Sequence, residues 1–220
     1  MPDRRVAAGR LFRLVLLLAL PVWLAACGHN ADPAPWAPDE AVQRARYVND
    51  EPPSLTLITV VDNLGGRGDH AGVIINAGER VLYDPAGSFR HPALPQRNDV
   101  IFGFTGSAEE VYIDFHVRDS HHMVLQTLIV PPEVAERALQ AALAEPKARP
   151  GQCAIKTAAI LNAAGIDAPR TLWPKVQMEA FADIPGVEIE WRIEPGVTPN
   201  RIGLDSTRHI QRLAPQPAMN

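Results

Sequence analysis

Apolar and polar positions divide the chain into early strands and later helices. β-branched and alternating apolar runs predict strands over 55–61, 70–76, 80–84, 99–104, 121–130 and 187–193. Apolar residues at helical spacing predict helices over 133–144, 153–164 and 176–182. A capping-box pattern at 107–110 predicts one more helix, with Val111, Phe115 and Tyr112 facing inward. This order indicates an α+β fold, in which helices pack on one side of an antiparallel sheet.

The N-terminal region differs in composition from the rest of the chain. Four arginines precede an apolar stretch over 14–26, which is too short to span a bilayer and is typical of a signal peptide. Its end, Leu24-Ala25-Ala26-Cys27, resembles the lipobox of bacterial lipoproteins. The resemblance implies cleavage before Cys27, acylation of that cysteine with fatty acids such as palmitate, and anchoring to a membrane on the periplasmic side. The alternative is an ordinary secreted protein in which Cys27 is incidental.

Domain organisation follows from these patterns. Residues 1–26 are expected to be the signal peptide, and 27–53, rich in proline, a lipid-anchored tether with a short helix over 41–47. The domain is expected over 54–200, and 201–220 is expected to be a tail.

Charge bears on the choice of partners. The chain of 220 residues has 21 Lys and Arg and 25 Asp and Glu. Removal of 1–26 takes away four arginines and one aspartate, which leaves 17 basic and 24 acidic residues and a net charge of −7. An acidic protein of the cell envelope is not expected to bind nucleic acid, and its expected partners are the membrane and a cell-wall or lipid substrate.

Cys153 is the residue best suited to chemistry. The chain has two cysteines, so acylation of Cys27 leaves Cys153 without a disulfide partner. Pro150-Gly151 places it in the first turn of the helix over 153–164, where the helix dipole and free N–H groups favour the thiolate. A thiolate is a nucleophile, and the same N–H groups can bind an oxyanion. The alternative is an inert cysteine of the core.

The order of motifs resembles that of a known enzyme group. A strand with His70-Ala71-Gly72, a hairpin strand ending Leu-Tyr-Asp-Pro-Ala-Gly over 82–87, and a later cysteine that opens a helix resemble the permuted papain-like cysteine hydrolases. That group is related to NlpC-type cell-wall peptidases and includes the lecithin:retinol acyltransferase type. The resemblance covers about residues 55–165. It implies a circularly permuted papain-like fold, with Cys153 as nucleophile and His70 as general base and acid.

A third residue should orient the imidazole, and Asp84 is the first candidate. A three-residue turn over 77–79 would place His70 and Asp84 on the same face of the hairpin, whereas a two-residue turn would place them on opposite faces. His91 is the alternative. Gln152 is a candidate for an oxyanion contact or is merely the residue that precedes the helix.

The resemblance implies a cysteine hydrolase, and together with the expected location it implies an amidase or peptidase on cell-wall peptides. The alternatives are a thioesterase or acyltransferase acting on lipid, and a cell-envelope lipoprotein that only binds. No cofactor is expected. His116, Asp119, His121 and His122 offer metal-binding groups, but their spacing matches no common zinc motif, so no metal site is expected either.

Overall fold

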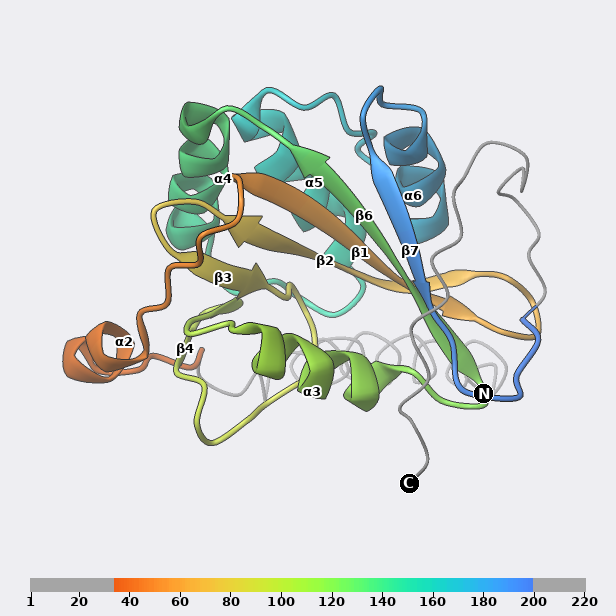
Figure 1. Cartoon of the computed structure of the whole chain (residues 1–220), viewed down its shortest axis with the longest axis horizontal. Coiled ribbons are helices and arrows are strands. Elements are labelled where there is room, and N and C mark those ends of the chain that lie inside the picture. Colours follow the sequence, from red (N-terminus) through yellow and green to blue (C-terminus); the bar gives the residue numbers. More distant parts are fainter. Residues whose placement is uncertain (1–33, 200–220) are drawn as a thin grey trace, which may run out of the picture. The chain divides into compact units, whose positions relative to one another are not determined.

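A computed structural model describes residues 34–199 and contains a mixed fold with an antiparallel sheet (Figure 1). The seven strands are Ser54–Asp62 (β1), Gly68–Asn76 (β2), Arg80–Tyr83 (β3), Gln96–Arg97 (β4), Val100–Ile101 (β5), His121–Ile129 (β6) and Glu188–Arg192 (β7), in the order β4-β5-β3-β2-β1-β6-β7. The described helices are Asp39–Ala45 (α2), Gly106–His116 (α3), Pro132–Ala144 (α4), Cys153–Ala164 (α5) and Pro174–Ala182 (α6). The predicted signal peptide, Cys27 and the tail over 201–220 lie outside the described residues.

Helices cover both faces of the sheet, so the expectation of helices on one side is wrong. Helices α4, α5 and α6 lie on one face and α3 on the other (Figure 1). On β1, Leu55 and Leu57 pack into the first of these layers, and Ile58 and Val60 pack into the layer beneath α3. A strand covered on both faces is apolar at consecutive positions, as the run in β1 is.

The hairpin of β2 and β3 has the register that brings His70 to Asp84. Asn76 pairs with Arg80 around a three-residue turn over 77–79, which confirms the longer of the two turns considered. Since side chains alternate between faces, this register places His70 and Asp84 on the face that α3 covers.

Strand β2 continues past the end of β3. The last pair is Val73 with Tyr83, after which the N–H of Asp84 turns away to the carbonyl oxygen of Asp99 at 2.8 Å. The first part of β2 therefore pairs with β1 alone, and α5 packs against β2. This gap in the sheet is where Cys153 meets β2.

Helix α3 begins at a different cap from the one predicted. Thr105 is the N-cap, and its side chain accepts the N–H of Ala108 at 3.2 Å, so the capping box at 107–110 is wrong. Its buried face was also predicted wrongly in part, because Ala108, Tyr112 and Ile113 are buried whereas Val111 and Phe115 are exposed.

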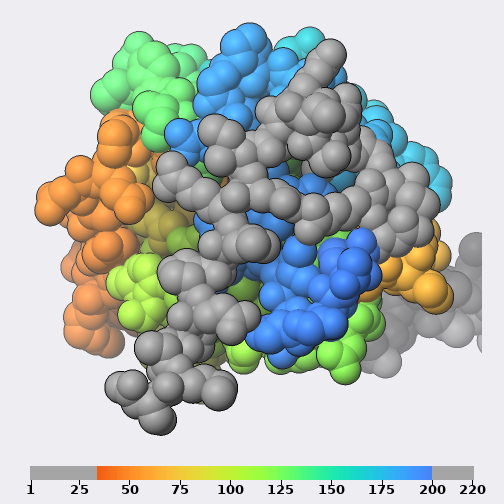
Figure 2. Space-filling model, turned by 45° about the vertical axis from the view of Figure 1, so that its right-hand side comes forward, coloured from red at the N-terminus to blue at the C-terminus, as the bar shows by residue number. Residues whose placement is uncertain are grey.

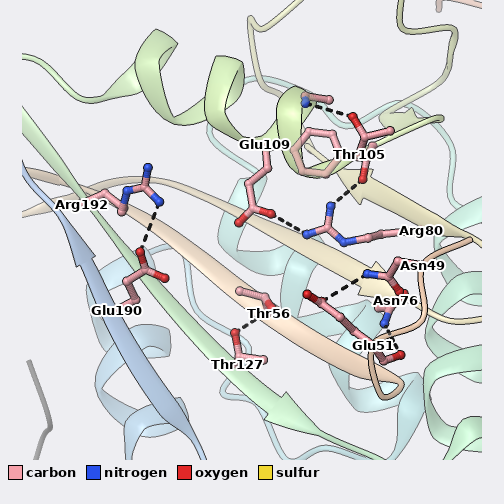
Figure 3. Close-up of polar contacts among 12 residues, drawn as sticks. Asn49, Glu51, Thr56, Asn76, Arg80, Thr105, Glu109, Thr127, Glu190 and Arg192 are labelled. Atoms are coloured by element: carbon pink, nitrogen blue, oxygen red, sulfur yellow. Dashed lines mark hydrogen bonds and ion pairs between the residues drawn. The ribbon is translucent and has the colours of Figure 1, made fainter. Parts of the chain in front are cut away.

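The segment over 35–53, expected to be part of a tether, packs on the domain. Trp36 forms a β-bridge with Arg97, and the Tyr47 carbonyl accepts the Arg80 N–H at 2.7 Å. The Asn76 side chain donates to the backbone carbonyl of Glu51 (Figure 3) and to that of Pro52. In the space-filling view the segment, in orange at the left, runs down one side of the described chain (Figure 2). These bonds satisfy backbone groups at the end of the hairpin and the sheet edge.

Candidate active site

Cys153 is the first residue of α5, in the first turn as predicted. The first bond of the helix ladder runs from the Lys156 N–H to the Gln152 carbonyl at 2.9 Å, so the N–H groups of residues 153–155 precede it. The Cys153 side chain is a free thiol and is buried, with 7% of the residue exposed. Most of the thiol is therefore shielded from solvent.

The sulfur of Cys153 accepts hydrogen bonds that favour its charged form. Burial raises the pKa of the thiol, but the His70 ring and the backbone N–H groups of Ala71 and Ala154 lower it, and the net shift is downward. The Ala71 N–H comes from the part of β2 that β3 leaves unpaired, and the Ala154 N–H comes from the start of α5. Strand and helix thus both stabilise the thiolate.

The His70 ring lies between the thiol and a buried carboxylate. Its Nε2 is 2.6 Å from Oδ1 of Asp84, which leaves Nδ1 for the sulfur. Burial lowers the pKa of His70, but the Asp84 charge, its hydrogen bond and Cys153 raise it to about 10. Burial likewise raises the pKa of Asp84, yet His70 and a hydrogen bond from Tyr112 lower it overall. The imidazole is therefore held as imidazolium at neutral pH.

Two residues of α3 complete the site, and the sequence interpretation gave neither a role in it. The Tyr112 hydroxyl donates to Oδ1 of Asp84 at 2.8 Å. The His116 ring lies parallel to that of His70, with centroids 5.8 Å apart and 5° between the planes. The four-residue spacing of Tyr112 and His116 on a predicted helix was the signal that both share one face.

His116 is a neutral neighbour. Its Nδ1 donates to the backbone carbonyl of Tyr112 at 2.9 Å, since a carbonyl can only accept. Burial lowers the pKa of His116, and the charge of His70 lowers it further, although the Tyr112 carbonyl raises it. An uncharged ring therefore stacks on the His70 imidazolium.

The other candidate residues lie elsewhere or have different partners. His91 is exposed, and its Nδ1 accepts the N–H of Ala93 at 3.3 Å, so Asp84 rather than His91 contacts His70. Oε1 of Gln152 accepts the N–H of Arg149 at 2.9 Å. Cys27 lies outside the described residues.

The histidines at the start of β6 have separate surroundings. Nε2 of His121 contacts Asp69 at 3.1 Å, whereas His122 is buried against Asn63 and stacks on Trp191. Among residues 34–199, no group of three or more His, Cys, Asp or Glu is arranged to hold a metal ion.

Helix α6 contacts residues close in sequence to both candidate catalytic residues. Pro174 and Lys175 contact the backbone at Gly68, two residues before His70. The Gln177 side chain donates to the carbonyl of Ala154, the residue after Cys153, at 3.3 Å. The apolar side chains of Leu172, Trp173 and Val176, in and just before this first turn, are exposed.

The arrangement supplies a nucleophile, an acid and base, and backbone donors. A thiolate paired with an imidazolium can attack an acyl carbon and then protonate a leaving group. No protein-family model, curated protein or solved structure matches this chain. None of the described helices is both long and apolar enough to cross a membrane.

Proposed function

We propose that this protein is a membrane-anchored cysteine hydrolase of the permuted papain-like group. The observation that carries the proposal is the chain of contacts from the Cys153 sulfur through His70 to Asp84, with 2.6 Å between Nε2 and Oδ1. It has the order of roles that acyl transfer by a cysteine requires: nucleophile, base and orienting carboxylate.

The reaction runs through an acyl-enzyme. The Cys153 thiolate attacks the carbonyl carbon, the C–S bond forms, and the N–H groups at the start of α5 hold the oxyanion. The His70 imidazolium gives its Nδ1 proton to the leaving amine as the C–N bond breaks. Water then attacks the thioester while His70 takes its proton, and the carboxylic acid leaves with the thiolate restored. Asp84 keeps the ring oriented throughout.

The proposed location is the cell envelope, where Cys27 carries the lipid anchor. The sequence before Cys27 supports this location, and a protein facing the periplasm meets cell-wall peptides. We therefore propose an amide bond in such a peptide as the substrate of Cys153.

Exposed apolar side chains just before α6 support a second candidate, an ester or thioester of a lipid. Trp173 is 68% exposed and Leu172 56%, in a segment held next to Gly68 and Ala154. Such side chains can contact an acyl chain whose carbonyl reaches Cys153. One assay separates these two candidate substrates. The same protein preparation and a Cys153→Ser variant are tested on purified cell-wall fragments and on p-nitrophenyl esters of short and long fatty acids.

The test of the dyad is the pH dependence of alkylation by iodoacetamide. In a Cys27→Ser chain Cys153 is the single thiol, so its rate is measured directly. Wild-type Cys153 should react fast near neutral pH, and His70→Asn should move the profile toward that of an ordinary thiol. Each unit of increase in the thiol pKa lowers the thiolate fraction at neutral pH about tenfold.

His91→Asn is the matched control for this test, because His91 is exposed and has no contact with Asp84 or Cys153 in the structure. The helix terminus still favours the thiolate in His70→Asn, so the shift should be partial. An unchanged profile in His70→Asn would contradict the proposal and favour a lipoprotein that only binds a partner.

A further inference from the structure

A single oxygen of Asp84 carries both of its side-chain hydrogen bonds. Oδ1 accepts from His70 Nε2 at 2.6 Å and from the Tyr112 hydroxyl at 2.8 Å. Oδ2 is buried and has no hydrogen-bond partner within residues 34–199. One oxygen of the carboxylate thus accepts two hydrogen bonds and the other none, although the two oxygens are chemically equivalent.

Two equivalent oxygens give the carboxylate a second way to meet the imidazole. Rotation about the Cβ–Cγ bond of Asp84 would exchange Oδ1 and Oδ2, and intermediate angles would offer His70 neither oxygen in line. The exchanged position is equivalent to the first, so the Tyr112 hydroxyl acts against the intermediate angles, which would leave this fully buried donor without an acceptor. An unsatisfied buried donor is costly, so the hydroxyl resists the rotation.

The Tyr112 ring is itself held in place. It makes edge-to-face contacts with Phe89 and Phe104, with centroids 5.1 and 5.9 Å away. The helix α3 that carries it is tied to β3, where the buried Arg80 donates to the Phe104 carbonyl and to Glu109 of α3 (Figure 3). The hydroxyl therefore reaches Asp84 from a rigid position.

We propose that Tyr112 is a positioning residue, which holds Oδ1 of Asp84 against His70 and thereby keeps the imidazole aligned with the Cys153 thiolate. The proposal rests on the proposed cysteine hydrolase and adds a fourth residue to its site. Tyr112 acts through Asp84 and does not touch the reacting atoms.

The experiment compares two tyrosine-to-phenylalanine variants in the Cys27→Ser chain. Tyr112→Phe removes the hydroxyl that meets Asp84, and Tyr83→Phe removes a buried hydroxyl that has no partner in the described part of the chain. Tyr112→Phe should shift the acid limb of the Cys153 alkylation profile to higher pH and slow alkylation near neutral pH by about two- to tenfold, the factor that one net hydrogen bond represents. Tyr83→Phe should leave the profile unchanged.

A double-mutant cycle with Asp84→Asn separates positioning from a general loss of structure. In the Asp84→Asn chain, Tyr112→Phe should cause no further shift, because the carboxylate on which it acts is gone. A further shift of full size in the Asp84→Asn chain would overturn the proposal. An alkylation profile that stays unchanged, or moves to lower pH, in Tyr112→Phe alone would also overturn it. If His70→Asn shifts the profile and Tyr112→Phe does not, the hydrolase proposal stands and only this role fails.

If the Tyr112→Phe variant does not fold, a measurement on a chain that keeps Tyr112 tests the proposal instead. The hydrogen-bonded hydroxyl proton of Tyr112 should be visible by NMR, and alkylation of Cys153 should move its resonance, because the charge lost at sulfur alters His70 and Asp84 in turn. A resonance that does not respond to alkylation would overturn the proposal.

Discussion

At the scale of single residues, the site depends on a buried cation placed between two anions. His70 has only 15% of its side chain exposed, and without partners its charge would be lost. Asp84 on one side and Cys153 on the other reverse that tendency. The pair of charges is therefore a property of the whole cluster, and each member titrates with the others.

The raised pKa of His70 predicts how stability depends on pH. A group whose pKa rises on folding stabilises the native state below its unfolded value, and this contribution is lost as pH rises through the folded value. In a Cys153→Ala chain, Asp84 still raises the pKa of His70, so the free energy of unfolding due to His70 should decline as pH rises from about 6.5 through its folded pKa, which lies below the value with Cys153 present. Urea unfolding at several pH values measures the decline.

His70→Gln in the same Cys153→Ala chain is the control. The Cys153→Ala background removes the thiol, whose lowered pKa would contribute the opposite slope over part of this range. The difference in the free energy of unfolding between the chain with His70 and the chain with His70→Gln should shrink as pH rises. A difference that stays constant from pH 6.5 to 10 would mean that folding does not raise the pKa of His70.

At the scale of helices and strands, local signals predicted the elements and tertiary contacts decided the rest. The start of α5 followed from Pro150-Gly151, and the hairpin register is one of the two that the sequence left open. The inner face of α3 did not, because positions 111 and 115 have the same four-residue spacing as 112 and 116. The face with Tyr112 and His116 points inward, where these side chains meet Asp84 and His70. Those contacts join elements far apart in the sequence, so no local pattern reveals them.

Contacts between elements also predict that Gly68, a glycine near the site, cannot accept a side chain without a shift of α6. A Cβ at Gly68 would lie 2.5 Å from the backbone nitrogen of Lys175 and 2.9 Å from Cβ of Pro174, so Gly68→Ala must push α6 away from β2. Overpacking of this kind destabilises by about 1–3 kcal/mol. Thermal unfolding should show the loss, and alkylation of Cys153 should slow because α6 holds the Ala154 carbonyl through Gln177.

Gly106→Ala is the matched substitution for comparison. A Cβ at Gly106 meets nothing within 4 Å, and alanine is the better residue in a helix such as α3. This variant should be at least as stable as the wild type. Equal stability of Gly68→Ala and Gly106→Ala would show that α6 does not press on β2 as described.

At the scale of the whole molecule, the sequence predicted the number of layers less well than the elements. The apolar run of β1 predicted a strand, and the order of early strands and late helices predicted helices on one side, whereas the structure buries β1 on both faces. The segment over 35–53 was interpreted as part of a tether because it is rich in proline and polar residues. Its partners are backbone groups of the hairpin and β4, which hydrophobic patterning does not reveal.

Anchoring is a prediction about the whole chain. Cells grown with radioactive palmitate should label the wild-type protein and Cys153→Ser equally, and Cys27→Ser not at all, because only Cys27 follows the lipobox-like sequence. The labelled forms should stay with membranes after a high-salt wash, since several acyl chains anchor firmly. Label on Cys27→Ser would contradict the lipoprotein proposal.

The packed N-terminal segment has a mechanical consequence. Arg46 donates to the Gly78 carbonyl, Tyr47 accepts from the Arg80 N–H, and Asn76 donates to the backbone of residue 52. Tension applied to the chain ahead of residue 35 is therefore borne first by the bonds of residues 35–37 to β4 and its turn, and next by the turn over 77–79, before any force reaches β1. That turn sets the register of His70 and Asp84. A pull from the N-terminal side would thus have to break the bonds to β4 before it could disturb the hairpin that aligns the proposed catalytic residues.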